Sequence, residues 1–154
     1  MLTNPVNGWS DFQLDNTSEY GLSYLDDIAF EWLEQAIHGL ETMLPFCVKG
    51  FCEPNRLLCM VSYYNCHIVC EGDGCSPLKE EYIINEYSHT SMLQFCEYLY
   101  NDIANNIDEW VSFPWNAEDM DSSERKKQLT QKLSKLKALI SERKERFGEN
   151  RVFL

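Results

Sequence analysis

The apolar run over residues 56–70 does most to decide what this chain can fold into. It is rich in leucine, valine, isoleucine, tyrosine and cysteine, and lies between Pro54-Asn55 and Glu71-Gly72-Asp73-Gly74. These residue types suit a strand, and Asn65 sits where a hairpin could turn within the run. Periodicity alone does not separate a strand from a buried helix in so short a segment. We expect a small antiparallel sheet, to which residues 80–87 add a third strand.

Three other segments carry helical patterns. Apolar side chains recur every three or four positions over residues 20–44, and Pro45 follows. Ser91 and Gln94 fit a capping box that opens a helix to about Val111, and Asp121 begins a last helix to about residue 147. The predicted fold is therefore α+β and helix-dominated, with three long helices and a small antiparallel sheet in the middle. An all-α bundle is the alternative if residues 56–70 are helical.

The length of 154 residues predicts a single domain, residues 1–154. Within it we expect an irregular N-terminal arm over residues 1–19 and a basic C-terminal helix over residues 121–147. No run of 18 apolar residues exists, so no membrane-spanning helix is predicted. The first ten residues have neither a basic region nor an apolar stretch, and we therefore expect a cytoplasmic protein.

Charge is divided sharply along the chain. Residues 1–124 contain 22 Asp and Glu but only three basic residues, whereas residues 125–154 contain ten Lys and Arg and three Glu. A charge imbalance of this size bears on partners, association rates and solubility rather than on fold. The acidic part suits a basic partner protein. The basic part suits either packing against the chain's own acidic body or binding to nucleic acid.

Six of the seven cysteines lie between residues 47 and 75. Cys66, Cys70 and Cys75, with His67, are weak candidates for zinc ligands, because none of the spacings is the short pair typical of such sites. Buried free thiols are the simpler interpretation, since cysteine is among the most buried residue types. No glycine-rich nucleophile turn or phosphate-binding loop occurs, so we assign no catalytic residue, no metal and no cofactor.

These observations predict a non-enzymatic acidic inhibitor that binds and neutralises a basic partner protein. An immunity protein or antitoxin against a nuclease-like toxin would fit, as would a phage-type nucleic-acid mimic. We expect no membrane contact and no direct nucleic-acid contact, and a homodimer stays an option. The alternatives are a Cys/His metal-binding protein or enzyme, and a nucleic-acid-binding adaptor that uses the basic C-terminal helix. The expected partner-binding residues are Asp26, Asp27, Glu31, Glu34, Asp108, Glu109, Trp115, Glu118, Asp119 and Asp121.

Overall fold

The computed structural model describes residues 1–72 and 79–148, which form an α+β fold with two antiparallel sheets and four helices. The expected arrangement of three long helices around one small sheet is wrong. The small sheet pairs β1 (Trp9–Phe12) with β2 (Tyr20–Ser23). The large sheet has the order β3 (Phe46–Phe51), β4 (Arg56–Val61), β5 (Cys66–Glu71) and β6 (Ile83–Ser88). The helices are α1 (Ile28–Thr42), α2 (Met92–Ala104), α3 (Ile107–Val111) and α4 (Ser122–Phe147).

The run over residues 56–70 is the hairpin of β4 and β5, which excludes the all-α alternative. The Ser62 N–H donates to the Asn65 carbonyl at 2.9 Å, so the chain reverses where Asn65 indicated a turn. The segment over residues 80–87 contains a short 3-10 turn followed by β6. The sheet is larger than expected because β3 joins it at one edge, directly after α1.

The N-terminal part of the chain is more regular than expected. Asn7 and Gly8 both have positive φ angles, and Val6 and Trp9 exchange two backbone hydrogen bonds across them. This is the geometry of a two-residue hairpin turn, for which Asn-Gly is the preferred sequence. The segment expected to be an irregular arm over residues 1–19 therefore contains β1.

The first helix begins eight residues later than the sequence pattern indicated. Residues 20–23 form β2, and α1 starts at Ile28. The spacing of three between Leu22, Leu25 and Ile28 imitates a helical repeat. The Leu25 side chain is exposed, which shows that this spacing did not mark one buried face.

Helix α2 opens with the expected capping box, in which Ser91 and Gln94 each accept a hydrogen bond from the other's backbone N–H. The helix predicted to continue to Val111 is interrupted at Asn105 and Asn106. Asparagine has low helix propensity because its side chain competes for backbone hydrogen bonds. Here the Asn106 amide donates to the Asp102 carbonyl, and Asn106 becomes the residue before α3.

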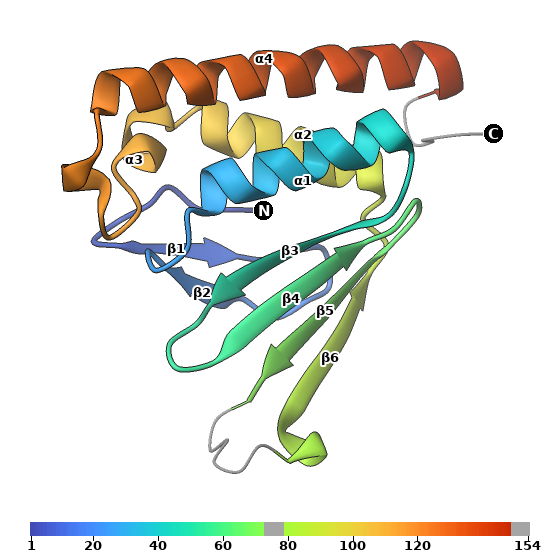
Figure 1. Cartoon of the computed structure of the whole chain (residues 1–154). Coiled ribbons are helices and arrows are strands. Elements are labelled where there is room, and N and C mark those ends of the chain that lie inside the picture. The colour runs from blue at the N-terminus through green and yellow to red at the C-terminus, as the bar shows by residue number, and fades with distance from the viewer. Residues whose placement is uncertain (73–78, 149–154) are drawn as a thin grey trace.

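The helices cover one face of the large sheet, and α4 lies across α1 and α2 as an outer layer (Figure 1). The core between these layers is centred on the Trp32 ring, whose centroid is 5.2 Å from that of Phe12 and 6.1 Å from that of Phe95. Over the described residues, no helix combines the length and apolar character that crossing a membrane requires.

Candidate protein-binding surface

The four predicted acids near the start of α1 each lie beside a cation of the same chain. Asp26 is buried, and its Oδ1 is 3.6 Å from Lys49 Nζ; Glu31 Oε2 is also 3.6 Å from that ammonium. Asp27 accepts a hydrogen bond from Arg125 at 3.0 Å, and Glu34 accepts one from Lys132 at 2.7 Å. The structure therefore brings these four acids together. The ion pairs of Asp27 and Glu34 are shorter than those of Asp26 and Glu31.

The remaining predicted acids lie around α3, the turn η2 (Ala117–Asp119) and the start of α4. Asp108 pairs with Lys126 at 2.7 Å, and Asp121 accepts hydrogen bonds from the first N–H groups of α4. Among the residues described, Glu109, Glu118 and Asp119 have no cation within 4 Å. The predicted acids therefore fall into two groups along the chain, one at the start of α1 and the other around α3, η2 and the start of α4.

Trp115 was expected to be exposed, and 63 % of its surface is accessible. Its backbone N–H donates to the Tyr24 carbonyl at 3.0 Å, which fixes the segment after α3 against the body. The neighbouring Trp110 and Phe113 are buried, and their rings pack together at 5.1 Å. Trp115 is therefore the exposed aromatic residue next to a buried aromatic pair.

The basic helix α4 packs on the chain's own acidic body. Lys132 and Lys135 pair with Glu34 and Glu41 of α1, and Lys144 pairs with Glu97 of α2. Leucines form the buried stripe between these ion pairs. Two arginines of α4 are themselves buried.

Arg125 and Arg143 stand at the two ends of that stripe. They are 18 positions apart (143 − 125), which is about five helical turns and places both side chains on the same face of α4. Arg125 donates to the Val111 carbonyl at the end of α3, and its guanidinium lies 4.5 Å from the centre of the Phe30 ring. Arg143 donates twice to the Leu40 carbonyl in the last turn of α1.

One face of the large sheet is not covered by helices. Residues on the helix-covered face, such as Val48, Cys59 and Ile68, are almost wholly buried, whereas their strand neighbours point the other way and are at least partly accessible. The strand register sets these neighbours in three rows across β3 to β6. We call this surface the open face. Its residues are Cys47, Met60, His67 and Tyr87; Lys49, Leu58, Val69 and Asn85; and Phe51, Arg56, Glu71 and Ile83.

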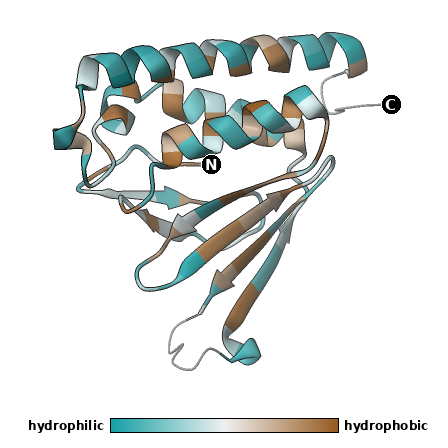
Figure 2. Ribbon diagram, viewed as in Figure 1, coloured by the Kyte–Doolittle hydropathy of each residue, from teal (hydrophilic) through white to brown (hydrophobic). Residues whose placement is uncertain are grey.

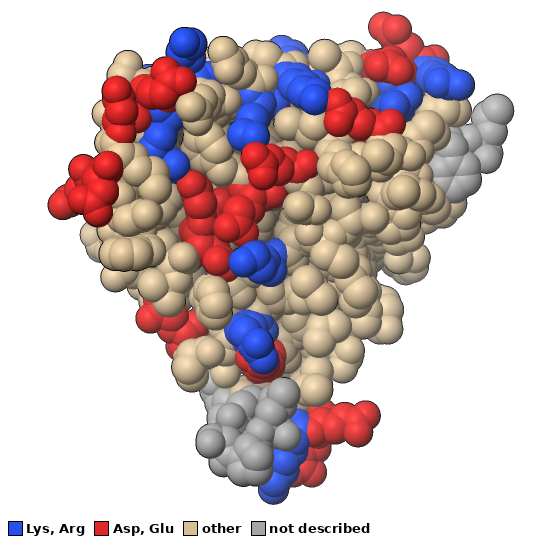
Figure 3. Space-filling view, in the orientation of Figure 1, with Lys and Arg blue, Asp and Glu red and all other residues tan. Residues whose placement is uncertain are grey.

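The open face is more apolar than a solvated sheet surface usually is. Leu58 in its centre is 39 % accessible; Val69 is its partner on β5, and Met60 is the next residue of β4 on this face. Glu71 is its single carboxylate, and Arg56 pairs with that group. Apolar segments of β4 and β6 are visible in Figure 2, and Figure 3 shows acidic side chains gathered over α1 beside a broad area with few charges. An antiparallel sheet with water on one side normally alternates apolar and polar residues.

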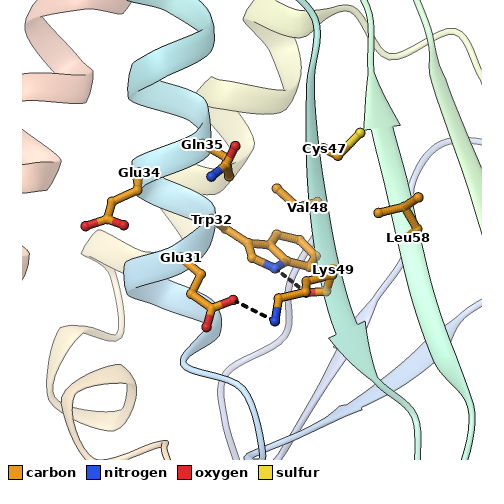
Figure 4. A pocket seen from close by; sticks show the side chains of 8 residues that line it. All are labelled: Glu31, Trp32, Glu34, Gln35, Cys47, Val48, Lys49 and Leu58. Atoms are coloured by element: carbon orange, nitrogen blue, oxygen red, sulfur yellow. Dashed lines mark hydrogen bonds and ion pairs between the residues drawn. The ribbon is translucent and has the colours of Figure 1, made fainter.

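A pocket of about 430 Å³ lies between α1 and β3, at the border of the open face (Figure 4). The fully buried Trp32 contributes to its wall, and its indole N–H donates to the Lys49 carbonyl at 2.8 Å. The side chains of Glu31 and Glu34 come from α1, and Leu58 comes from β4. The complete lining is Glu31, Trp32, Glu34, Gln35, Cys47, Val48, Lys49 and Leu58.

The pocket is electrostatically negative on its helix side. Partial burial raises the pKa of Glu31, and although the Lys49 ammonium opposes this shift, the nearby Asp26 and Asp27 carboxylates add to it. A raised carboxyl pKa means that the surroundings disfavour a further negative charge. Burial, the largest cause, disfavours charge of either sign, whereas the Asp26 and Asp27 carboxylates specifically favour an additional cation.

The cysteine cluster does not form a metal centre in the described part of the chain, which contains no group of three or more suitably placed His, Cys, Asp or Glu side chains. Cys66 and Cys70 are buried on the helix side of β5, whereas His67 lies on the open face, stacked on Tyr87 at 4.3 Å. Neighbouring strand residues point to opposite faces, so His67 does not share a site with those thiols. Cys75 lies outside the described residues.

Two thiols of the sheet are stabilised in their protonated form. A hydrogen bond with Cys66, together with burial, raises the pKa of Cys59, and a hydrogen bond with Cys70 acts in the same way on Cys52. Thiols held in this form are poor nucleophiles. Cys59 is a buried residue of β4, whereas Cys52 lies directly after β3 and is partly buried.

Comparisons with protein-family models, curated protein sequences and solved structures gave no significant match. The sequence pattern predicted the acids in and just before α1 but indicated neither the open face nor the pocket beside it. The available signal was the doubled leucine at residues 57 and 58, where a half-buried strand would alternate.

Proposed function

We propose that this chain is a non-enzymatic inhibitor that binds a basic partner protein, as an immunity protein or antitoxin does with a nuclease-like toxin. The observation that supports the proposal is the acidic surface of α1 lying directly beside the apolar open face. An apolar centre with a charged border is the usual composition of a protein interface. A partner that places basic side chains over Glu31 and Glu34 would match the charge of that border.

The size of the open face argues for a partner that also reaches α1. Four strands spaced about 4.8 Å apart, with six residues at about 3.3 Å each, cover roughly 400 Å². A standard protein interface buries about 800 Å² on each partner. The sheet alone therefore supplies about half of what a stable complex needs, and the acids and pocket beside β3 are the adjoining surface that can supply more.

The internal ion pairs of α4 weigh against the nucleic-acid-binding alternative. Lys126, Lys132, Lys135 and Lys144 each lie within 4 Å of a carboxylate of the body. A polyanion would have to compete with those carboxylates and approach a chain of net charge −12. A basic protein meets neither obstacle.

The proposal is tested by capturing a partner from the native host with the tagged chain, and then measuring its association. We expect a basic protein whose association rate falls steeply between about 50 and 500 mM salt, since steering is screened over that range. Leu58→Arg places a cation in the centre of the open face and should weaken binding by at least about tenfold.

Val6→Arg is the matched control, because Val6 is also exposed but lies in the N-terminal hairpin. This variant should bind like the unmodified chain. An acidic partner, a rate indifferent to salt, or equal binding by the two arginine variants would each contradict the proposal.

A further inference from the structure

The pocket between α1 and β3 combines an apolar wall with a negatively charged mouth. Leu58 and the exposed Cys47 supply accessible apolar surface, with Trp32 and Val48 buried behind them, while Glu31 and Glu34 stand on the helix side with their carboxylates partly exposed. Its volume of about 430 Å³ falls within the range of about 300–1,000 Å³ that is usual for ligand pockets. An arginine or lysine side chain has matching chemistry, because its long aliphatic stem packs on apolar surface while its charged end stays near carboxylates.

Lys49 already places a cation at the charged side of this pocket, but it does so loosely. Its Nζ is 3.6 Å from both Asp26 Oδ1 and Glu31 Oε2, whereas a charge-assisted hydrogen bond is about 2.7–2.9 Å long. The Lys49 side chain is 61 % exposed. The Lys49–Glu31 pair is long and exposed on both sides and is therefore weak, so a better-placed cation can take the place of Lys49 beside Glu31.

The carboxylates around the pocket are not fully compensated. Asp26, Asp27, Glu31 and Glu34 carry four negative charges, and the cations that pair with them are Lys49, Arg125 and Lys132, which leaves one charge in excess (4 − 3). The other oxygen of Asp26, Oδ2, is buried and has no hydrogen-bond partner among the described residues. Asp26 does not itself line the pocket, so the excess of negative charge is the observation that favours one more positive group there.

We infer that this pocket receives an arginine or lysine side chain of the basic partner, and that Lys49 occupies its charged end until the partner displaces it. The inference rests on the proposed function for the identity of the partner, but the pocket itself is testable without one. Lys49 then acts as a competitor, so removing it should strengthen binding of a cationic side chain. A purely structural lysine would have no such effect.

The test is a titration of the ¹⁵N-labelled chain with Nα-acetyl-arginine amide, followed by NMR. The neutral isostere Nα-acetyl-citrulline amide is the control ligand. We expect shift changes at the backbone amides of Glu31, Gln35 and Cys47, and weaker binding of the citrulline probe. Lys49→Met should tighten binding of the arginine probe by about two- to fivefold, since the competing pair is worth up to about 1 kcal/mol.

Lys135→Met is the matched control variant. Lys135 also pairs with a glutamate of α1, at 2.6 Å, but its partner Glu41 does not line the pocket. This variant removes the same charge and should leave the affinity of the arginine probe unchanged. The double variant Glu31→Gln, Glu34→Gln should abolish the shift changes at the pocket.

Three results would overturn the inference: equal binding of the two probes, no tightening by Lys49→Met, or shift changes confined to other acids such as Glu118 and Asp119. Failure here rejects the pocket alone, because the probe experiment uses no partner. The proposed function would still stand if a basic partner were captured and Leu58→Arg abolished its binding. Conversely, loss of that capture result would not alter the binding of the arginine probe.

Discussion

Replacing Arg143 by methionine tests how the basic C-terminal helix is held to the body. Arg143 is only 6 % exposed, and its Nε and one terminal nitrogen donate to the Leu40 carbonyl at 3.0 and 2.8 Å. Leu40 lies in the last turn of α1, where carbonyl groups have no partner within the helix. Methionine preserves much of the aliphatic packing but donates no hydrogen bond. The buried carbonyl of Leu40 would therefore lose both donors.

The expected loss of stability follows from those contacts. A hydrogen bond that involves a charged group contributes about 1.5–3 kcal/mol, and leaving a buried acceptor without a partner costs a similar amount. Because both donors share one carbonyl, we count the interaction once and expect a loss of about 2–3 kcal/mol. A domain of this size has a total free energy of unfolding of about 5–15 kcal/mol, so the effect is readily measured.

Arg146→Met is the control, since it makes the same substitution one turn further along at an exposed position. The Arg146 guanidinium lies 5.0 Å from the centre of the Phe147 ring, an exposed contact worth less than about 1 kcal/mol. Urea unfolding followed by circular dichroism and tryptophan fluorescence gives both values from the midpoints and slopes. If the two variants differ by less than about 0.5 kcal/mol, the buried hydrogen bonds do not hold α4, and the reasoning fails.

Two further predictions concern other contacts of the fold. Ser91→Ala removes the side-chain acceptor of the α2 capping box and should lower the free energy of unfolding by about 1 kcal/mol, measured by urea unfolding. Burial raises the pKa of Glu86, but hydrogen bonds from Tyr20 and Ser18 outweigh it and hold that pKa below its usual value. A lowered carboxyl pKa adds stability above the unfolded-state value of about 4.3, and this stability is lost as the pH falls through the folded-state pKa. Glu86→Gln should therefore destabilise the fold at pH 7, and the difference from the unmodified chain should shrink below about pH 4; a difference that stays constant with pH would contradict this.

The parts of the fold that were predictable are those fixed by local chemistry. Ser91 and Gln94 form their capping box within four residues, and Asp121 caps α4 through its own side chain. Asn65 reverses the chain between two apolar segments. None of these features depends on which distant segment packs against it, so the sequence pattern is sufficient.

The wrong predictions concern segments whose structure is determined by contacts with residues distant in the sequence. Residues 20–23 become a strand because β1 lies beside them, although their apolar spacing also fits a helix. The interruption of α2 at Asn105 and Asn106 is a local signal that the apolar pattern on either side concealed. The open face was missed because an apolar run that is buried on one side resembles one buried on both. Only the strand register shows that Leu58 and Val69 share the uncovered side.

The division of charge along the chain acquires a definite structural meaning from these contacts. α4 places its lysines against the outer side of α1 and α2, and its two buried arginines bind backbone carbonyls of α1 and α3. Among the described residues, Lys49 is the cation that pairs with α1 from the β3 side, at a distance too long for a strong hydrogen bond. The basic segment thus pairs with acids of α1 that are themselves partly exposed, Glu34 and Glu41 among them. It leaves an excess of negative charge beside the apolar face that the fold leaves open, which is the arrangement that a basic partner would recognise.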